Sequence, residues 1–456
     1  MNVNLKKKIS KNQIYEGPIV VSKMFEHLLR QKVIYCSRGR IYLYDEDEDR
    51  YILIEKHNEW HSISLFFSKD IRMHIPTDYI SEILKRLKLC ADIQVSVDDF
   101  NYRVNLMNVK NGALEYRTGK LLSKNRNYKF TYRLNVNYLA DANIEDAPNF
   151  KKFCETSLQG DTQKIELLLQ FIGYILSPLI CAKKALVLLG EPNSGKSLIL
   201  HLIEFIMGSE FISNISLENL NKRFKTAVLS TKLLNICGEL SAKPLKDIEV
   251  FKMVVGGDTL SGEFKGKDEF EFKNKCKLLF AGNVLPPIKN EDISTAFVDR
   301  LAVLRFNYSI PEELRNYNLA QELESEVDII FSLSIKALNR LIDNNFVFNV
   351  PEDTKNLLTG YSFQQTNIDV FIKDWCVIDG QLKIHSFTLY TAYKKFCEEN
   401  SITPISQNLF SQKIASTCGV KNGKFRLCGS NPARGFYGIS LKDINTQDSE
   451  TYDNIE

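Results

Sequence analysis

The alternation of apolar and polar residues predicts a mixed α/β chain that begins with short strands and helices. Helical spacing at Val20–Gln31 and Gln163–Leu176 predicts helices, because apolar residues recur there every three or four positions. Strand-like stretches flank turn residues at Ile41–Ile54 and Asn108–Lys120, which predicts hairpins. We therefore expect an α+β N-terminal domain over residues 1–180, with its last helix packed beneath the block that follows.

The next block, residues 181–348, alternates apolar strands with helical stretches. This order is typical of a mostly parallel sheet with helices on its faces. A helical connector over Glu312–Phe346 closes the block. The expected strands are Ala185–Leu189, Lys232–Cys237, Cys276–Ala281 and Leu301–Phe306.

A stretch containing proline and threonine, residues 349–368, is interpreted as a linker. The block after it, residues 369–441, has three helical patterns and then two strands around a turn rich in Gly and Asn. That order suggests a small winged-helix-like domain. Residues 442–456 are polar and acidic and are expected to be disordered. The three helical patterns are Asp369–Cys376, Phe387–Asn400 and Asn408–Thr417.

The composition and the cysteine spacing argue against a membrane-spanning protein and against a zinc site or disulfide framework. The 456 residues are 44% apolar and 25% charged, as in soluble globular proteins. The net charge of +3 is too small to indicate a nucleic-acid partner by itself, and the ten cysteines form no C-x-x-C pair. The longest apolar run, Phe171–Ala182, is interrupted by Pro178 and is shorter than the roughly 20 residues of a membrane span. We expect a cytoplasmic protein with reduced thiols and no membrane partner.

The strongest chemical signal follows the apolar run Ala185–Leu189. It fits the phosphate-binding pattern G-x-x-x-x-G-K-[ST], between a strand and a helix. The glycines allow backbone N–H groups to surround a polyphosphate, Lys196 reaches the β- and γ-phosphates, and Ser197 binds Mg²⁺. The alternative is a chance Gly-rich turn before a helix. The predicted site for ATP and Mg²⁺ comprises Gly190, Glu191, Pro192, Asn193, Ser194, Gly195, Lys196 and Ser197.

Two polar residues follow later strands. Glu239 comes after Leu233–Cys237, where a carboxylate can polarise the attacking water or hold Mg²⁺ through water. Gly238 occupies the place of a usual first acid, so Glu239 acts alone. Asn283 follows the next strand and can hydrogen-bond the γ-phosphate or the lytic water. A capping glutamate and a turn asparagine are the structural alternatives.

Arg300 opens the strand Leu301–Phe306 and can supply a guanidinium to the transferring phosphate. Such arginines often come from a neighbouring subunit, which makes catalysis depend on assembly. A salt bridge with Asp299 is the alternative role. Arg305 is a competing candidate in the interior of the strand.

The stretch Ser261–Lys273 alternates polar and aromatic residues and predicts a hairpin. Phe264, Lys265 and Lys267 lie near its tip. Lysines contact phosphates and an aromatic ring stacks on bases, which is how a channel loop holds single-stranded nucleic acid. A solvated Lys/Glu hairpin is the alternative, and the position of the stretch within the ATPase block favours DNA binding.

The order of these motifs resembles superfamily 3 helicases, especially the helicase halves of poxvirus and satellite-phage primase-helicases. The resemblance rests mainly on two segments, residues 104–122 and 264–287. It implies an AAA+ core in a hexameric ring around DNA, moving 3′ to 5′ with ATP between subunits. Lys196 and Ser197 would bind phosphate and Mg²⁺, and Glu239 would activate water. Asn283 would sense the γ-phosphate, and Arg300 would be the finger in trans.

The sequence departs from that family in two respects. The block before the helicase is too short for the primase-polymerase domain that relatives often carry. Asp45, Asp47 and Asp49 could mimic its acids, but a solvated hairpin is the favoured interpretation. The finger region reads Val298-Asp299-Arg300, where relatives often have two adjacent arginines.

Basic residues at Lys421, Lys424, Arg426 and Arg434 mark the expected wing and turn. These residues suit phosphate contacts to duplex DNA. Alternatively, the domain docks a separate primase or polymerase, and the sequence does not decide between these two roles. The leading hypothesis is an ATP-dependent replication helicase acting on single-stranded or forked DNA. The alternatives are an origin-binding initiator with little translocation and a small-molecule P-loop kinase, for which no basic lid segment is evident.

Overall fold

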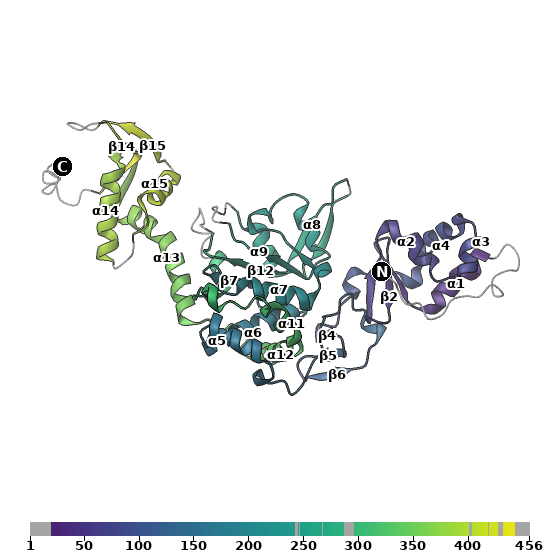
Figure 1. The fold of residues 1–456 in the computed structure, drawn as a ribbon. Coiled ribbons are helices and arrows are strands. Elements are labelled where there is room, and N and C mark those ends of the chain that lie inside the picture. Colours follow the sequence, from purple (N-terminus) through teal and green to yellow (C-terminus); the bar gives the residue numbers. More distant parts are fainter. Residues whose placement is uncertain are drawn as a thin grey trace.

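The computed structural model describes residues 20–241, 245, 247–266, 268–286, 296–400, 404–417, 419–426 and 432–442. A central parallel sheet lies between an N-terminal and a C-terminal unit (Figure 1). No helix within those ranges has both the length and the apolar character needed to cross a membrane. The predicted tail lies outside the described residues, apart from Lys442.

The N-terminal unit packs an antiparallel sheet, ordered β1-β2-β3, against helices. The predicted helix Val20–Gln31 and the hairpin at Ile41–Ile54 are confirmed. Met24, Leu28 and Ile41 belong to an apolar core that is separate from that of the central sheet. The elements are α1 (Val20–Gln31), β1 (Ile34–Ser37), β2 (Arg40–Asp45), β3 (Arg50–Leu53), α2 (Glu59–Ser64), α3 (Lys69–His74) and α4 (Thr77–Leu89).

The residues that follow pack with the central part of the chain. The hairpin predicted over Asn108–Lys120 is confirmed, since turns before Gly112 and before Lys120 separate strands ordered β4-β5-β6. Leu106 and Leu114 share one apolar core with the central sheet and α6. The block predicted over residues 1–180 therefore contains two packing units. These elements are β4 (Leu106–Val109), β5 (Gly112–Glu115), β6 (Lys120–Leu122), α5 (Pro148–Ser157) and α6 (Thr162–Leu176).

The central sheet has the order β13-β7-β12-β9-β8, with every neighbouring pair parallel. The four predicted strands are confirmed, whereas β8 was not predicted because it has only two residues. A two-residue strand is too short to show a period. The elements are β7 (Ala185–Gly190), α7 (Lys196–Met207), β8 (Ile212–Ser213), α8 (Lys225–Leu229), β9 (Leu234–Cys237), α9 (Glu249–Gly256), β12 (Lys277–Gly282) and β13 (Leu301–Phe306).

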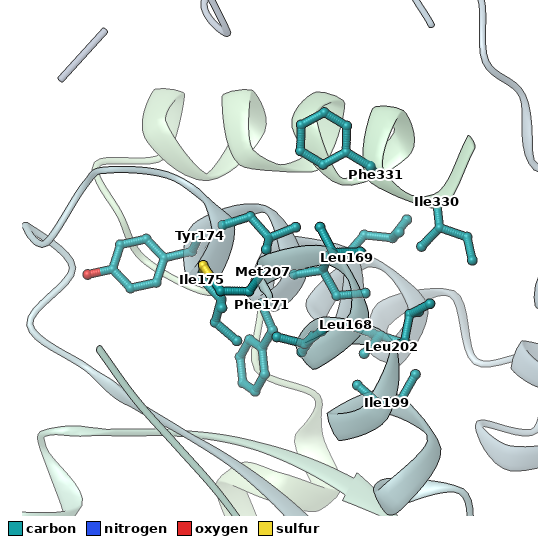
Figure 2. Packing of buried hydrophobic residues seen from close by; sticks show 14 of the residues in the cluster. Leu168, Leu169, Phe171, Tyr174, Ile175, Ile199, Leu202, Met207, Ile330 and Phe331 are labelled. Atoms are coloured by element: carbon teal, nitrogen blue, oxygen red, sulfur yellow. The ribbon is translucent and has the colours of Figure 1, made fainter. Parts of the chain in front are cut away.

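Both faces of this sheet are buried, as expected for parallel strands covered by helices. Along β7, Leu186 and Leu188 enter one apolar core, while Val187 and Leu189 enter the other. Helix α6 lies within the first core, where its apolar residues face those of α7 and α12 (Figure 2). The prediction that this helix packs beneath the central block is thus confirmed.

The predicted hairpin within Ser261–Lys273 is also confirmed, as β10 (Thr259–Gly262) paired with β11 (Phe270–Lys273). The helical connector comprises α11 (Leu319–Ser325) and α12 (Val327–Asp343). Helix α13 (Glu352–Trp375) then leads to the C-terminal unit (Figure 1).

The stretch predicted as a linker is helical from Glu352 onward. Pro351 precedes this helix, and Glu352 and Asp353 in its first turn favour a helix start. The C-terminal unit contains a strand that was not predicted, β14, so its sheet has the order β14-β16-β15. Its elements are β14 (Cys376–His385), α14 (Ser386–Glu399), α15 (Gln407–Ser416), β15 (Lys421–Phe425) and β16 (Ala433–Leu441).

Candidate functional site

The Gly-rich loop connects β7 to α7 at the carboxyl edge of the central sheet. Gly195 has a left-handed φ of 103° immediately before the helix, and a Cβ there would lie 2.7 Å from a ring carbon of Phe153. A Cβ at Gly190 would lie 1.9 Å from the backbone oxygen of Phe306. Only glycine fits either position, so the loop's shape depends on both.

Lys196 is the first residue of α7, and its ammonium turns back into the loop. Its Nζ donates to the backbone oxygens of Gly190, at 2.8 Å, and Glu191, at 2.6 Å. Burial lowers the pKa of Lys196, and the nearby Glu191 carboxylate partly offsets this effect. Ser194 is buried, whereas Ser197 in the first turn of α7 is exposed. A phosphate can replace these two carbonyl oxygens as the partner of the ammonium. The arrangement therefore fits a nucleotide-binding loop.

The chain leaving β13 supports the loop from behind. Ser309 Oγ donates to the backbone oxygen of Pro192 at 2.9 Å. The backbone N–H of Ile310 donates to the backbone oxygen of Asn193 at 3.1 Å. Nothing in the sequence pattern indicated these contacts, because they join segments far apart in the chain. Glu191, Pro192 and Asn193 themselves are exposed.

Glu239 and Asn283 come to the same edge of the sheet. Strand β12 lies between β7 and β9, and its Gly282 pairs with Leu189, so Asn283 follows beside the start of the Gly-rich loop. Phe280 pairs with Cys237, and the N–H of Leu240 donates to the backbone oxygen of Ala281. Glu239 therefore lies beside the end of β12. Both side chains are exposed.

Arg300 lies at the opposite edge of the sheet. It precedes β13, whose first residue pairs with Ala185 and whose last residue pairs with Gly190. The length of the strand, roughly 17 Å, therefore separates Arg300 from the Gly-rich loop of its own chain. Its Nη1 donates to the backbone oxygen of Ala296 at 2.8 Å. The structure does not bring Arg300 together with the other predicted catalytic residues.

Arg300 lines a cavity of about 520 Å³ at this amino edge. Lys184 and Lys252 contribute further positive charge, and Glu249, Asp258 and Asp299 contribute carboxylates. Burial lowers the pKa of Lys184, while Asp299 acts in the opposite direction. The competing candidate Arg305 donates to the backbone oxygen of Asp353 at the start of α13.

Asp353, at the start of α13, connects the end of β13 to α6. Its carboxylate pairs with Lys164 Nζ at 2.9 Å and accepts from Asn307 Nδ2 at 2.8 Å. Burial alone would raise the pKa of Asp353, but these two partners outweigh it and hold the pKa below its usual value. The sequence pattern did not indicate this cluster. The acidic first turn after Pro351 was the one signal that could have marked the residue.

The hairpin residues are placed as predicted where the structure describes them. Phe264 stacks on Phe270 with ring centroids 5.6 Å apart, and Lys265 is exposed at the tip. Lys267 lies outside the described residues. Arg223 holds the start of the hairpin loop through two 2.9 Å hydrogen bonds to Glu263, which lower the pKa of that carboxyl.

The acids of the first hairpin have structural partners. Asp45 accepts hydrogen bonds from the N–H groups of Asp47 and Glu48, and Asp49 accepts one from the hydroxyl of Tyr44. Asp45 and Asp49 are buried, so the prediction of a solvated turn is wrong for these two. Among the described residues, no group of three or more His, Cys, Asp or Glu side chains could hold a metal ion.

In the C-terminal unit, Lys424 on β15 pairs with Arg434 on β16, and Arg426 follows β15. All three side chains are exposed. The pairing places the predicted wing cations on two adjacent strands.

The fold and this site define a mixed α/β protein whose central parallel sheet carries a Gly-rich loop and polar residues at its carboxyl edge. Three families match parts of the chain. Residues 22–159 match "D5 N terminal like", residues 188–300 match a family of unknown function (DUF5906), and residues 367–445 match "Poxvirus D5 protein-like".

One relative, from Acanthamoeba polyphaga mimivirus, is named as a putative helicase and is 25% identical over 223 residues. That match covers 46% of this chain and 23% of the relative, so the chain corresponds to about a quarter of that protein. The apo structure of the NrS-1 C-terminal region has a similar fold, with a TM-score of 0.50 and 15% identity over 91% of this chain and 98% of the other. The sequence matches confirm the predicted resemblance to superfamily 3 helicases, and the solved structure has a similar fold.

Proposed function

We propose that this chain is an ATP-dependent DNA helicase that unwinds duplex DNA in the replication of a virus, phage or mobile element. The proposal includes an AAA+ core, a hexameric ring and 3′ to 5′ movement. The observation that carries it is the shared edge of the central sheet, where the Gly-rich loop, Asn283 and Glu239 meet. Strand β12 leads to Asn283 and lies between β7, which leads into the Gly-rich loop, and β9, which leads to Glu239. This strand order suits an AAA+ core.

At this edge each side chain has a distinct role. The loop N–H groups and Lys196 bind and orient the triphosphate, and Ser197 with Glu239 would hold Mg²⁺, which supplies positive charge to the phosphates. Glu239 accepts a proton from the attacking water. Asn283 hydrogen-bonds the γ-phosphate or that water without adding negative charge.

The position of Arg300 supports a site shared between two copies of the chain. A guanidinium at the amino edge cannot reach its own loop, because the strand length of roughly 17 Å exceeds the reach of an arginine side chain. In a head-to-tail ring, one copy's amino edge faces the next copy's carboxyl edge. Arg300, beside Lys184 and Lys252, then meets the neighbour's γ-phosphate.

The hairpin supports a contact to DNA. Lys265 is exposed at the tip of a hairpin that follows α9 and leads into β12, so movement of the core carries the tip with it. Phe264 adds an aromatic surface for stacking. The C-terminal unit is proposed as a winged-helix-like domain that presents Lys424, Arg426 and Arg434 to phosphates.

DNA-stimulated ATP hydrolysis tests the proposal. The wild-type chain is expected to release phosphate several-fold faster with single-stranded DNA, and Lys196→Ala is expected to abolish release. The matched control is Lys56→Ala, an exposed lysine of the N-terminal unit. Hydrolysis that DNA does not affect would contradict a helicase and favour a small-molecule kinase.

A further inference from the structure

The sheet of the C-terminal unit has one face packed on helices and one that is open. Ile384 and Phe436 are cross-strand partners, and both are buried in a core with Leu389 of α14 and Phe410 of α15. Successive residues of a strand point to opposite faces. The other face, called here the outer face, is therefore formed by Lys383, His385, Lys421, Gly423, Phe425, Ala433, Gly435 and Tyr437.

We propose that this outer face binds single-stranded nucleic acid by stacking a base on Tyr437 between Lys383 and Lys421. Tyr437 on the middle strand pairs with Lys383 on β14 and with Lys421 on β15. The three residues form one row across the sheet. The tyrosine is 40% exposed, and both lysines are exposed.

Glycines allow the aromatic rings to lie against the sheet. A Cβ at Gly423 would lie 2.2 Å from Cε2 of Tyr437, and a Cβ at Gly435 would lie 2.7 Å from Cζ of Phe425. The two rings are in contact, with centroids 4.8 Å apart, and Phe425 is buried. The tyrosine ring is thus held over a glycine and supported by a buried ring, with part of it open to solvent.

The positive charge of the outer face favours an anionic ligand. Its register positions carry two lysines and a histidine but no carboxylate, which suits an anionic chain better than an apolar protein segment. Neighbouring strands lie about 4.8 Å apart, so the two lysine backbones are roughly 10 Å apart across the tyrosine. Long lysine side chains can then contact the phosphates on both sides of one stacked base. Stacking on a ring requires an unpaired base, which favours a single strand over a duplex.

This surface shares Lys421 with the predicted wing cations but does not include Lys424 and Arg434. Lys424 and Arg434 pair one position beyond Gly423 and Gly435, so they belong to the opposite face. The inference rests on the nucleic-acid partner of the proposed function and adds a contact outside the ATPase core. Binding to the outer face requires no ATP.

Fluorescence anisotropy of a labelled oligothymidine with the full chain, without ATP, tests the inference. All variants carry Lys265→Ala, so that the hairpin contributes less to binding. Tyr437→Ala is expected to weaken binding roughly 5- to 150-fold, the usual effect of losing one base–aromatic stack. Tyr437→Phe, which keeps the ring, and Lys395→Ala, an exposed lysine on α14, are the matched controls.

Two further measurements make the result specific. Lys383→Ala and Lys421→Ala are each expected to lower the salt dependence of binding by about 0.7 in log–log slope. An oligonucleotide with 5-iodouracil is expected to cross-link to Tyr437 or Phe425. Unchanged affinity in Tyr437→Ala, or cross-links confined to the central part of the chain, would overturn the inference.

The outcome is separable from that of the proposed function. A chain that unwinds DNA but binds equally well without the Tyr437 ring keeps the helicase and loses the outer-face site. A chain that binds through Tyr437 but neither hydrolyses ATP nor unwinds DNA keeps the site and loses the helicase.

Discussion

The separation of Arg300 from Lys196 within one chain predicts that two inactive variants restore each other's activity. Arg300→Ala alone is expected to lower ATP hydrolysis by about 10³- to 10⁵-fold, the usual effect of removing an arginine finger. ATP binding is expected to be spared, because Arg300 lies roughly 17 Å from its own loop. Lys196→Ala alone is expected to lose the phosphate contact and hydrolysis together.

In a head-to-tail ring, an intact site needs Lys196 from one copy and Arg300 from its neighbour. When the two variants are mixed in equal amounts, about one interface in four has both residues, since each is present with a chance of about one half. The mixture is therefore expected to recover up to about a quarter of the wild-type rate. If Arg300 acted within its own chain, no copy in the mixture would have both residues.

Phosphate release is the assay, with binding of a fluorescent ATP analogue measured in parallel. Arg30→Ala is the control, because Arg30 is an exposed arginine paired with Glu26 on a surface helix. Loss of nucleotide binding in Arg300→Ala would refute the argument. So would a mixture that assembles by size-exclusion chromatography but stays as inactive as either variant.

Three further predictions follow from the core and the hairpin. Gly190→Ala is expected to lower the thermal midpoint and weaken nucleotide binding, because its Cβ would lie 1.9 Å from the Phe306 oxygen; an unchanged midpoint would contradict this. Replacing Lys265 and Lys267 together by Ala is expected to leave ATP hydrolysis in place while strand separation falls, and normal separation would refute the hairpin's role. Burial lowers the pKa of Lys277 to about 7, so the unfolded chain binds more protons above pH 7 and stability should rise with pH. The rise is about 1 kcal/mol per unit between pH 8 and 9; urea midpoints should show it, and Lys277→Met should lack it.

The sequence pattern predicted the central strands because each is a buried apolar run followed by a glycine or polar residue. It also predicted the order of the motifs, and hence the shared edge, once the strands were taken as parallel. Strand β8 was missed because two residues show no period. Strand β14 was missed because most of its ten residues are exposed and Asp379-Gly380 resembles a turn, so the segment shows no apolar alternation.

Long-range contacts could not be predicted from local patterns. The support of the Gly-rich loop by Ser309, the cluster around Asp353 and the row formed by Lys383, Tyr437 and Lys421 all join segments far apart in the sequence. Spacing along the chain carries no information on such pairs. The distance between Arg300 and the loop likewise required the register of β13 against β7.

The most direct test of the central claim is strand displacement on a forked DNA duplex with ATP and Mg²⁺, with Lys196→Ala as the inactive comparison. We predict that the wild-type chain unwinds forks with a 3′ loading tail and that the variant does not. Absence of unwinding despite DNA-stimulated ATP hydrolysis would contradict a translocating helicase and favour an initiator that uses ATP to assemble on DNA.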